Sequence, residues 1–209
     1  MRPHPMTVYE AALDGEPVVA LGSGGIVALA VARWTDEPDA IDDLMLARCE
    51  APVLDVGCGP GRLVAALNAR GIPALGIDIS ARAVQHARFR GATVLRRAVE
   101  HEVPAEGRWG TVLLADGNIG IGGDPAALLD RCRTLLAARG LVLVETDVDD
   151  DADDTSPLTL RRADGRTSRP MPWARTGVHA LVRLAPRCGF AVLEQWHLQG
   201  RTVVALRVL

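Results

Sequence analysis

Short apolar runs alternate with amphipathic stretches along the chain from Pro52 onward. Runs of four or five β-branched or leucine residues are typical of strands buried on both faces, and their alternation with helical stretches is typical of a parallel sheet covered by helices. We therefore predict an α/β fold whose first five core strands are Val53–Val56, Ala74–Ile77, Thr93–Leu95, Thr111–Leu114 and Leu141–Glu145.

Three helices are expected between these strands, at Arg62–Arg70, Ala81–Arg90 and Pro125–Ala138. The third has the clearest boundary signals, because Asp124 can cap its free N–H groups, Pro125 suits a first helical turn and Gly140 can end it. The pattern then predicts a helix at Gly177–Arg187, capped by Thr176. It ends in two strands, Ala191–His197 and Thr202–Val208, joined by a Gln-Gly-Arg turn.

Two segments fall outside this alternation. Residues 1–50 predict a helix at Thr7–Leu13, a hairpin turning at Ser23-Gly24-Gly25 and a helix at Pro38–Cys49, whereas residues 147–175 begin with an aspartate run and predict a hairpin turning at Asp164-Gly165. We interpret residues 1–209 as one domain, with an N-terminal cover (1–50), a cofactor-binding core (51–146), a lid (147–175) and a closing unit (176–209). Loops that cover the open end of such a sheet commonly determine substrate specificity.

Composition narrows the classes of partner. The chain has 209 residues, of which 48% are hydrophobic and 23% charged, so it is long and apolar enough to build its own core. Its formal net charge is −3, so it has no strong positive field that would attract nucleic acid or anionic membranes. Its four cysteines are far apart, which favours neither a disulfide framework nor a zinc site. With no signal-peptide pattern and no long apolar segment, we expect a cytoplasmic protein without a nucleic-acid or membrane partner.

The strongest chemical signal is the glycine-rich turn from Asp55 to Gly61, which joins the first core strand to a helix. Gly57, Gly59 and Gly61 alternate there, as expected where the backbone bends sharply and a ligand must approach without meeting a Cβ atom. A dinucleotide fold would place a third glycine where this chain has Arg62, so nicotinamide binding is a weak alternative. A glycine turn without a ligand is an equally weak one.

Asp78 ends the second strand about twenty residues after the glycines, where an acid can accept hydrogen bonds from both hydroxyls of a ribose. The alternative is that Asp78 or Ser80 only caps the following helix. The combination of the glycine turn and this acid favours a nucleoside-containing cofactor.

With these motifs, residues 51–209 resemble a class I S-adenosylmethionine-dependent methyltransferase of the small stand-alone type. The resemblance implies a Rossmann-like, mostly parallel seven-stranded sheet in the order 3-2-1-4-5-7-6, with a closing antiparallel strand and helices on both faces. It implies that S-adenosyl-L-methionine is the cofactor and that the residues which contact it are Asp55, Gly57, Cys58, Gly59, Gly61, Asp78, Ile79, Ala98, Val99 and Asp116. One departure stands out: many members carry an acid for the adenine amino group where this chain has Ala98.

The loop after the fourth strand is expected beside the reacting methyl group. Methyl transfer depends mainly on holding the acceptor in line with the sulfur–methyl bond, and we predict Asn118 and Asp116 as its catalytic residues. The loop lacks the Asn-Pro-Pro-Tyr type of signature found in many amino-group methylases, and a merely flexible connection is the alternative for Asn118.

We expect a small-molecule acceptor. It should be bound by Asn118 and Ile119 and by residues of the two covering segments that could line its pocket, namely Tyr9, Trp34, Trp173 and Arg175. Each of the covering residues is equally well interpreted as packing. Trp109 is expected in the core, and His179 at the surface or at a helix cap.

No metal site is predicted. Asp116 and Asp147 fall near the places where some O-methyltransferases hold magnesium, but acidic loops are more often simply solvated. A non-catalytic module that binds S-adenosylmethionine is the alternative function. The sequence leaves the acceptor atom (N, O or C), the use of a general base and the oligomeric state open.

Overall fold

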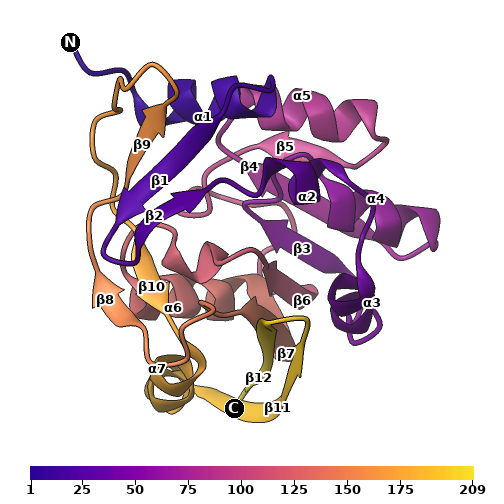
Figure 1. Cartoon of the computed structure of the whole chain (residues 1–209). Coiled ribbons are helices and arrows are strands. Elements are labelled where there is room, and N and C mark those ends of the chain that lie inside the picture. The colour runs from indigo at the N-terminus through magenta and orange to yellow at the C-terminus, as the bar shows by residue number, and fades with distance from the viewer.

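A seven-stranded sheet forms the centre of the computed structural model, which describes residues 1–209 (Figure 1). Its strands, in chain order, are β3 (Val53–Val56), β4 (Ala74–Asp78), β5 (Val94–Arg96), β6 (Trp109–Leu114), β7 (Leu136–Glu145), β11 (Phe190–Leu198) and β12 (Arg201–Val208). They lie side by side in the order β5-β4-β3-β6-β7-β12-β11. Counted along the chain from β3, this row is 3-2-1-4-5-7-6, and only β12 runs antiparallel to the others.

Alternation along the strands divides the interior into two cores, one on each face of the sheet. Leu54, Val112 and Val142 point to the larger core, whereas their neighbours Val53 and Leu113 point to the smaller one. Successive side chains of a strand face opposite sides of a sheet, so these apolar runs are buried on both faces as the pattern predicts.

Helices cover both faces, as expected for this class of fold. The smaller core is closed by α3 (Ala40–Leu46), α4 (Arg62–Ala69) and α5 (Ala81–Phe89), and the larger one by α6 (Pro125–Leu135) and α7 (Val178–Leu184) (Figure 1). Two of these helices, α6 and α5, begin at side-chain caps that the sequence analysis considered. The side chain of Asp124 accepts from the amide of Ala127 at 3.0 Å, and that of Ser80 from the amide of Ala83 at 3.0 Å.

The end of α6 differs from the prediction. The helix stops at Leu135 rather than at Ala138, and β7 begins at Leu136, so that Gly140 lies inside the strand instead of ending the helix. Leu136 pairs with Trp109 of β6, and Arg139 adopts a left-handed φ of 63° in the irregular stretch before Leu141. Pairing with β6 therefore overrides the helical pattern of these residues.

The closing unit also differs in detail. The cap of α7 is Gly177, which makes no side-chain cap bond, so the predicted cap Thr176 is wrong. The helix continues only as a 3-10 turn, η2 (Ala185–Cys188), because Pro186 lies in its first turn and lacks the N–H of a regular helix. The last two strands form the expected hairpin, with positive φ angles at Gln199 and Gly200 that suit a two-residue turn.

Residues 1–50 form the cover, which reaches the carboxyl ends of β6 and β7 through Arg33 and one face of the sheet through α3. They contain α1 (Pro5–Leu13), β1 (Val18–Gly22), β2 (Gly25–Ala28), α2 (Val31–Thr35) and the shortened α3. The β1–β2 hairpin turns at Ser23-Gly24 as predicted, whereas α2 is unpredicted and α3 is shorter than the predicted Pro38–Cys49. Asp39, with Asp42, supplies a capping box that fixes the start of α3.

The cover and the lid are joined by hydrogen bonds between strands, a feature that the sequence does not predict. Lid strand β9 (Thr159–Arg162) pairs with β1 to give a small antiparallel sheet in the order β2-β1-β9, which lies to the left in Figure 1. The chain turns at Asp164-Gly165 as expected, but β9 finds its main partner in β1 rather than in a hairpin of its own. A second pair joins β8 (Asp153–Thr155) to β10 (Ala174–Thr176).

None of the helices has the length and hydropathy needed to cross a membrane, and the four cysteines are unpaired.

Candidate cofactor and active site

The glycine turn after β3 has the backbone that its sequence requires. Gly57, Gly59 and Gly61 have φ angles of 72°, 53° and 81°, a region that favours glycine. A Cβ atom at Gly57 would lie 2.7 Å from the amide nitrogen of Asn118, and one at Gly61 would lie 2.7 Å from the Cβ atom of Ala87. The first and third glycines therefore allow close packing by neighbouring elements.

Asp78, at the end of β4, is tied to this turn. Its carboxylate accepts from the amide of Gly59 at 3.0 Å and from the amide of Ser80 at 2.8 Å. Burial raises the pKa of Asp78, and these hydrogen bonds partly oppose the shift. Ser80, rather than Asp78, is the cap of α5, and the side chain of Ile79 is exposed. Asp78 therefore faces the turn, where a ribose is expected.

Asp55 is a buried acid with no partner in the protein. Its side chain is 2% exposed, and no hydrogen bond or ion pair reaches its carboxylate, although a carboxylate removed from water normally needs one. Burial raises its pKa to about 7. An acid in this state, beside the glycine turn, is available to a cationic group of a ligand.

The loop after β6 packs directly on the glycine turn. Asn118 begins a short 3-10 helix, η1 (Asn118–Gly120), and its side-chain amide donates to the carbonyls of Val56 at 2.9 Å and Gly57 at 3.0 Å. Asn118 thus fixes the position of the turn. Ile119 is 1% exposed and belongs to the larger core, which argues against the predicted contact of its side chain with substrate.

The lid reaches the same loop through Trp173. This residue pairs with Ile121 in an isolated antiparallel bridge, and its indole nitrogen lies 2.7 Å from the place of a Cβ atom at Gly120. Arg175, two residues later, has both its Nε and Nη2 on the carboxylate of Asp147, at 2.9 and 2.8 Å. An anionic substrate would have to compete with Asp147 for this guanidinium.

Two aromatic residues of the cover lie over the turn from the other side. The hydroxyl of Tyr9 is 3.4 Å from the place of a Cβ atom at Gly59, and the ring centroids of Tyr9 and Trp34 are 6.0 Å apart. The indole nitrogen of Trp34 is buried and has no hydrogen-bond partner. These contacts place the aromatic pair beside the predicted cofactor site.

The predicted adenine region lies after β5. Val99 is buried, Ala98 is half-buried and Glu100 is exposed. The carbonyl of Val99 accepts from Nε of Arg131 at 2.8 Å, which fixes the backbone there. Glu100 lies beside Gly122, 3.9 Å from the place of its Cβ atom.

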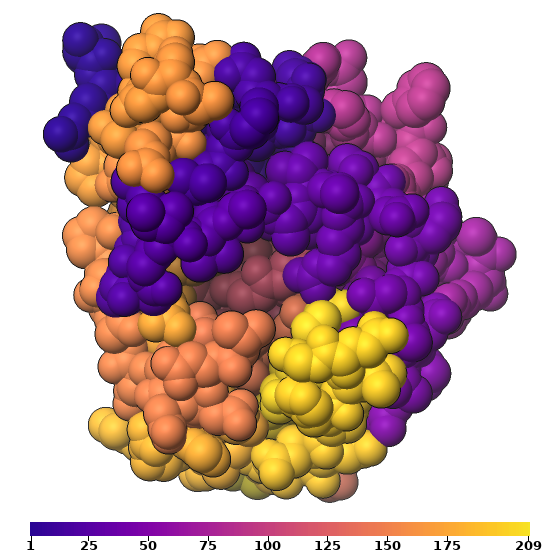
Figure 2. Space-filling view, in the orientation of Figure 1, coloured from indigo at the N-terminus to yellow at the C-terminus, as the bar shows by residue number.

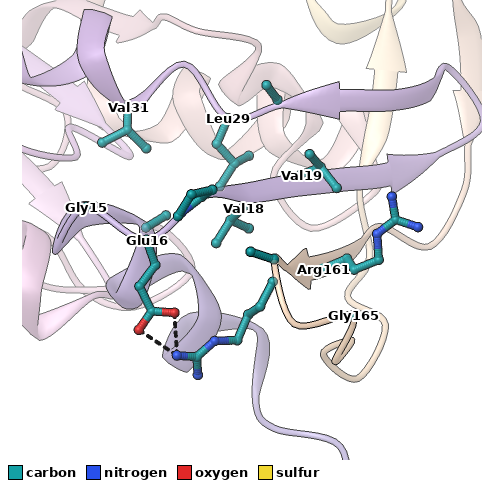
Figure 3. Close-up of a pocket in the computed structure, with 13 residues that line it drawn as sticks. Gly15, Glu16, Val18, Val19, Leu29, Val31, Arg161 and Gly165 are labelled. Atoms are coloured by element: carbon teal, nitrogen blue, oxygen red, sulfur yellow. Dashed lines mark hydrogen bonds and ion pairs between the residues drawn. The ribbon is translucent and has the colours of Figure 1, made fainter.

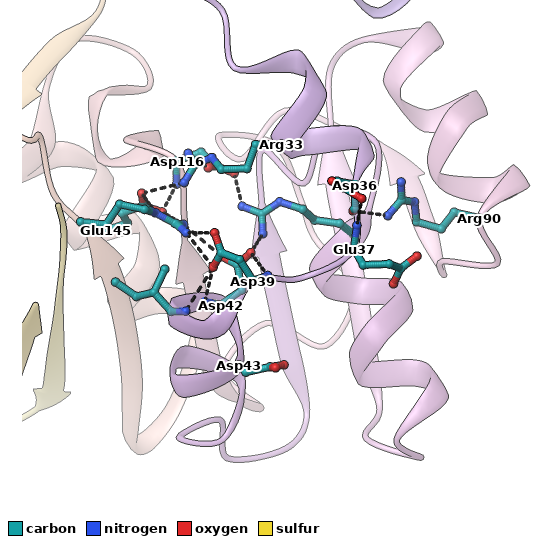
Figure 4. A network of polar contacts seen from close by, with 12 residues as sticks. Arg33, Asp36, Glu37, Asp39, Asp42, Asp43, Arg90, Asp116 and Glu145 are labelled. Carbon is teal, nitrogen blue, oxygen red and sulfur yellow. Dashed lines mark hydrogen bonds and ion pairs between the residues drawn. The ribbon is translucent and has the colours of Figure 1, made fainter. Parts of the chain in front are cut away.

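A network of seven charged side chains lies at the carboxyl ends of β6 and β7, and sequence reasoning missed all of it except Asp116 (Figure 4). Its members are three arginines and four acids: Arg33, Arg62, Arg201, Asp39, Asp42, Asp116 and Glu145. The replacement of the third dinucleotide glycine by Arg62 was the one signal that could have pointed to it.

The network ties the cover to the core. Arg201 bonds Asp39 at 2.7 Å, Asp42 at 3.0 Å and Glu145 at 2.7 Å. Arg62 pairs with Asp42 and, at 2.8 Å, with Asp116. Asp116 has an unusual backbone for a non-glycine residue, with a φ of 55°, and its amide donates to Glu145 at 2.8 Å.

The two acids at these strand ends have opposite pKa shifts. Burial raises the pKa of Asp116. Burial also opposes ionisation of Glu145, but its hydrogen bonds with Arg201 and the positive charges of Arg201 and Arg33 lower its pKa overall. Asp147, the other acid considered for magnesium, belongs to a separate cluster with Arg175.

Two hollows of the surface adjoin the cover and the lid. Figure 2 shows a hollow between the cover, the lid and the closing strands, with residues from the middle of the chain at its floor. A separate cavity of about 700 Å³ lies between the cover and the lid, lined by residues such as Val18, Leu29, Val31 and Arg161 (Figure 3). This cavity shares no lining residue with the glycine turn or the loop after β6.

Three solved structures illustrate what the fold is similar to. A SAM-dependent methyltransferase from Bacteroides fragilis, in complex with S-adenosyl-L-homocysteine, is 19% identical with a TM-score of 0.79, over 98% of this chain and 95% of that chain. The 1,6-didemethyltoxoflavin-N1-methyltransferase of Burkholderia thailandensis, with 1,6-didemethyltoxoflavin and S-adenosylhomocysteine bound, is 19% identical with a TM-score of 0.60, over 84% and 80%. The CcbJ methyltransferase of Streptomyces caelestis is 16% identical with a TM-score of 0.63, over 84% and 92%.

Sequence comparison identifies the family. A search of curated proteins found no match. The family model described as a methyltransferase domain matches residues 32–195, which is most of the chain and includes the glycine turn, Asp78 and the loop after β6. Together with the sheet order, this match shows that the chain belongs to the methyltransferase domain family and is a methyltransferase with the class I fold.

Proposed function

We propose that this enzyme transfers a methyl group from S-adenosyl-L-methionine to a small-molecule acceptor. The observation that carries the proposal is Asp55, which is 2% exposed, lies beside the glycine turn and has a carboxylate that no hydrogen bond reaches. A cationic ammonium group, such as the one at the amino-acid end of this cofactor, would satisfy that carboxylate.

The remaining contacts follow from the same geometry. Asp78, which already accepts the amide of Gly59, would accept the ribose hydroxyls, and the backbone around Ala98 and Val99 would hold the adenine. When bound, S-adenosylmethionine supplies an electrophilic methyl carbon on a positively charged sulfur. The fit is supported by the presence of this cofactor or its demethylated product in similar structures of low sequence identity.

The residues of the chain would contribute orientation and exclusion of water. Asn118 fixes the loop after β6 against the glycine turn, while Trp173 and the pair Tyr9–Trp34 close the region from two sides. An acceptor held in line with the reacting bond at contact distance gains most of its rate enhancement from such positioning.

A small acceptor is supported by charge and by shape. The chain has a net charge of −3, and the hollow in Figure 2 is bounded by the cover, the lid and the closing strands. A substrate of the size of a small molecule fits such a bounded hollow better than a nucleic-acid duplex, which would need a broad basic face.

Calorimetry with S-adenosylmethionine, S-adenosylhomocysteine and NAD tests the proposal. We expect the first two to bind and NAD not to bind. Asp78→Ala should weaken binding by about ten- to a hundredfold, the effect of about 1.5–3 kcal/mol for a lost charged hydrogen-bond partner. Asp130→Ala, which removes an exposed acid of α6, is the matched control and should leave affinity unchanged.

Binding of NAD without either sulfur compound would refute the proposal. Binding of S-adenosylmethionine with no transfer of a labelled methyl group to any low-mass fraction of a cell extract would instead indicate a non-catalytic binding module.

A further inference from the structure

A buried acid, Glu145, and a half-buried acid, Asp116, meet at the place where the acceptor is expected. Asp116 follows β6 and Glu145 ends β7, and these strands are parallel neighbours, so their ends lie at the same edge of the sheet. Arg33 of the cover lies between them, paired with Asp116 and 3.4 Å from Glu145 (Figure 4). Ligands of parallel sheets bind beyond this edge.

The charges of the network do not balance. Its four carboxylates face three guanidinium groups, and without Arg33 only Arg62 and Arg201 would remain. Asp55, close enough to interact with Arg62, Asp116 and Asp42, adds a further acid with no partner. If Arg33 moves away, another cation is therefore favoured in its place, because buried carboxylates need a positive charge to offset their own.

Arg33 is the member of the network that can be replaced. Its side chain is 30% exposed, compared with 3% for Arg62 and 11% for Arg201. It belongs to α2, a helix of five residues, none of which is buried as a whole, and the helix has no side-chain cap. Few contacts oppose its displacement, in contrast to the two arginines of the core.

Unpartnered polar groups beside the acids point independently to a ligand. The indole N–H of Trp34, the residue after Arg33, is buried and has no acceptor. Asp55 is 2% exposed, and no hydrogen bond reaches its carboxylate. Buried polar groups in folded proteins are nearly always satisfied, so an unpaired donor in the residue after Arg33 and an unpaired acid that interacts with Asp116 favour a bound molecule here.

We infer that the acceptor is an amine, which enters as a cation, takes the place of the Arg33 guanidinium between Asp116 and Glu145, and gives its proton to Asp116. This inference rests on the proposed function and adds the class of the substrate. Arg33 would then keep the acids compensated when no substrate is present.

The chemistry requires such a proton acceptor. An ammonium group has no lone pair, so one N–H bond must break and its proton must move to a carboxylate oxygen of Asp116. The freed nitrogen pair then forms the bond to the methyl carbon, while the bond from that carbon to sulfur breaks and leaves its electrons on sulfur. The raised pKa of Asp116 suits a base, and the lowered pKa of Glu145 suits an acid that stays ionised and holds the cation.

A binding experiment tests the cation site without a known substrate. Arg33→Ala is prepared with S-adenosylhomocysteine, and its melting temperature is measured with propylammonium chloride or with the neutral isostere 1-propanol plus sodium chloride. We expect propylammonium to raise the melting temperature by about 2–4 °C more than propanol does. Arg33→Gln is the second variant if the alanine protein does not fold, and Arg161→Ala, which removes a guanidinium with no ion pair, is the matched control.

The difference should disappear in Arg33→Ala/Asp116→Asn and be absent in Arg161→Ala. Equal responses to propylammonium and propanol in the Arg33 variant, or the same response in the Arg161 variant, would overturn the cation site.

A transfer experiment then tests the acceptor atom. The wild-type protein is incubated with S-adenosylmethionine carrying a carbon-13 methyl group and a panel of primary amines paired with the corresponding alcohols. The carbon-13 chemical shift reports the atom that receives the methyl group. Methyl on nitrogen supports the inference. Methyl on oxygen, carbon or sulfur overturns it but leaves the proposed function standing, and if no member of the panel reacts, the binding experiment decides.

Discussion

Replacing Arg62 by methionine removes the guanidinium that bridges Asp42 and Asp116 while keeping a side chain of similar length. The side chains of Arg62 and Asp42 are only 3% and 1% exposed, so this pair is screened little by water. Removal of one partner from a buried ion pair typically costs about 3–5 kcal/mol, because the other charge is left uncompensated.

Asp42 keeps a contact with Arg201 at 3.0 Å, and Asp116 keeps its pair with Arg33, so we expect the lower end of that range. For a domain of this size, about 3 kcal/mol corresponds to a fall in melting temperature of about 6–12 °C. Scanning calorimetry or circular dichroism at pH 7 measures it.

The effect should depend on pH. Burial raises the pKa of Asp42, but the hydrogen bond and charge of Arg62 outweigh it and lower the pKa overall. An acid whose pKa is lower in the folded state adds stability above its unfolded pKa and loses that contribution as the pH falls through the folded value. The difference between wild type and Arg62→Met should therefore shrink below about pH 4.

Arg70→Met, beyond the other end of the same helix, is the control. Arg70 and its partner Asp43 are 43% and 55% exposed, and such surface pairs contribute about 0–1 kcal/mol. A fall of less than about 3 °C for Arg62→Met, or an equal fall for Arg70→Met, would refute the view that the buried network stabilises the fold.

Three further predictions concern the glycine turn. If Asp55 must be ionised to hold the cofactor, its pKa of about 7 makes S-adenosylmethionine bind about fivefold more weakly at pH 6 than at pH 7, and calorimetry should show this dependence flattened in Asp55→Asn. Asn118→Ala removes both hydrogen bonds to the carbonyls of Val56 and Gly57, so cofactor affinity should fall about tenfold together with methyl transfer; unchanged affinity would mean that the turn holds its shape without Asn118. Gly61→Ala should lower the melting temperature more than Gly71→Ala, because both positions have positive φ but only at Gly61 would the new Cβ atom meet a neighbour, Ala87 at 2.7 Å; equal losses would contradict the close packing.

Local signals predicted most of the central fold. Val53–Val56 is a strand with the predicted bounds, because an apolar run between Pro52 and the glycines has no competing structure. Asp124 and Pro125 begin α6 as expected, since a cap is satisfied within its own turn. The helix was wrongly predicted to continue through Leu136–Gly140 for a different reason. Leu136 pairs with Trp109 of the neighbouring strand β6, and no local pattern encodes that pairing.

The residues proposed to hold the cofactor could be located by sequence reasoning for the same reason. Asp55, the glycines and Asp78 lie at strand ends whose positions follow from the fold class, and the structure brings Asp78 onto the amide of Gly59. The charge network was not accessible. Arg201 and Asp39 are 162 residues apart, and a sequence gives no sign of which distant charges will meet.

The position of Asn118 was predictable from the sequence, but its contacts were not. The sequence places it in the right loop, which is why it was predicted near the methyl group. Its two hydrogen bonds to the glycine turn depend on the loop's three-dimensional course and give it a positioning role toward the backbone.

The pairing of β1 with β9 affects the order in which the molecule can form during synthesis. β1 spans Val18–Gly22, but its partner is complete only after the ribosome has passed Arg162, well after the strands that carry the glycine turn and Asp78. Until then the nascent chain exposes one edge of β1, and an unpaired strand edge can pair with another chain.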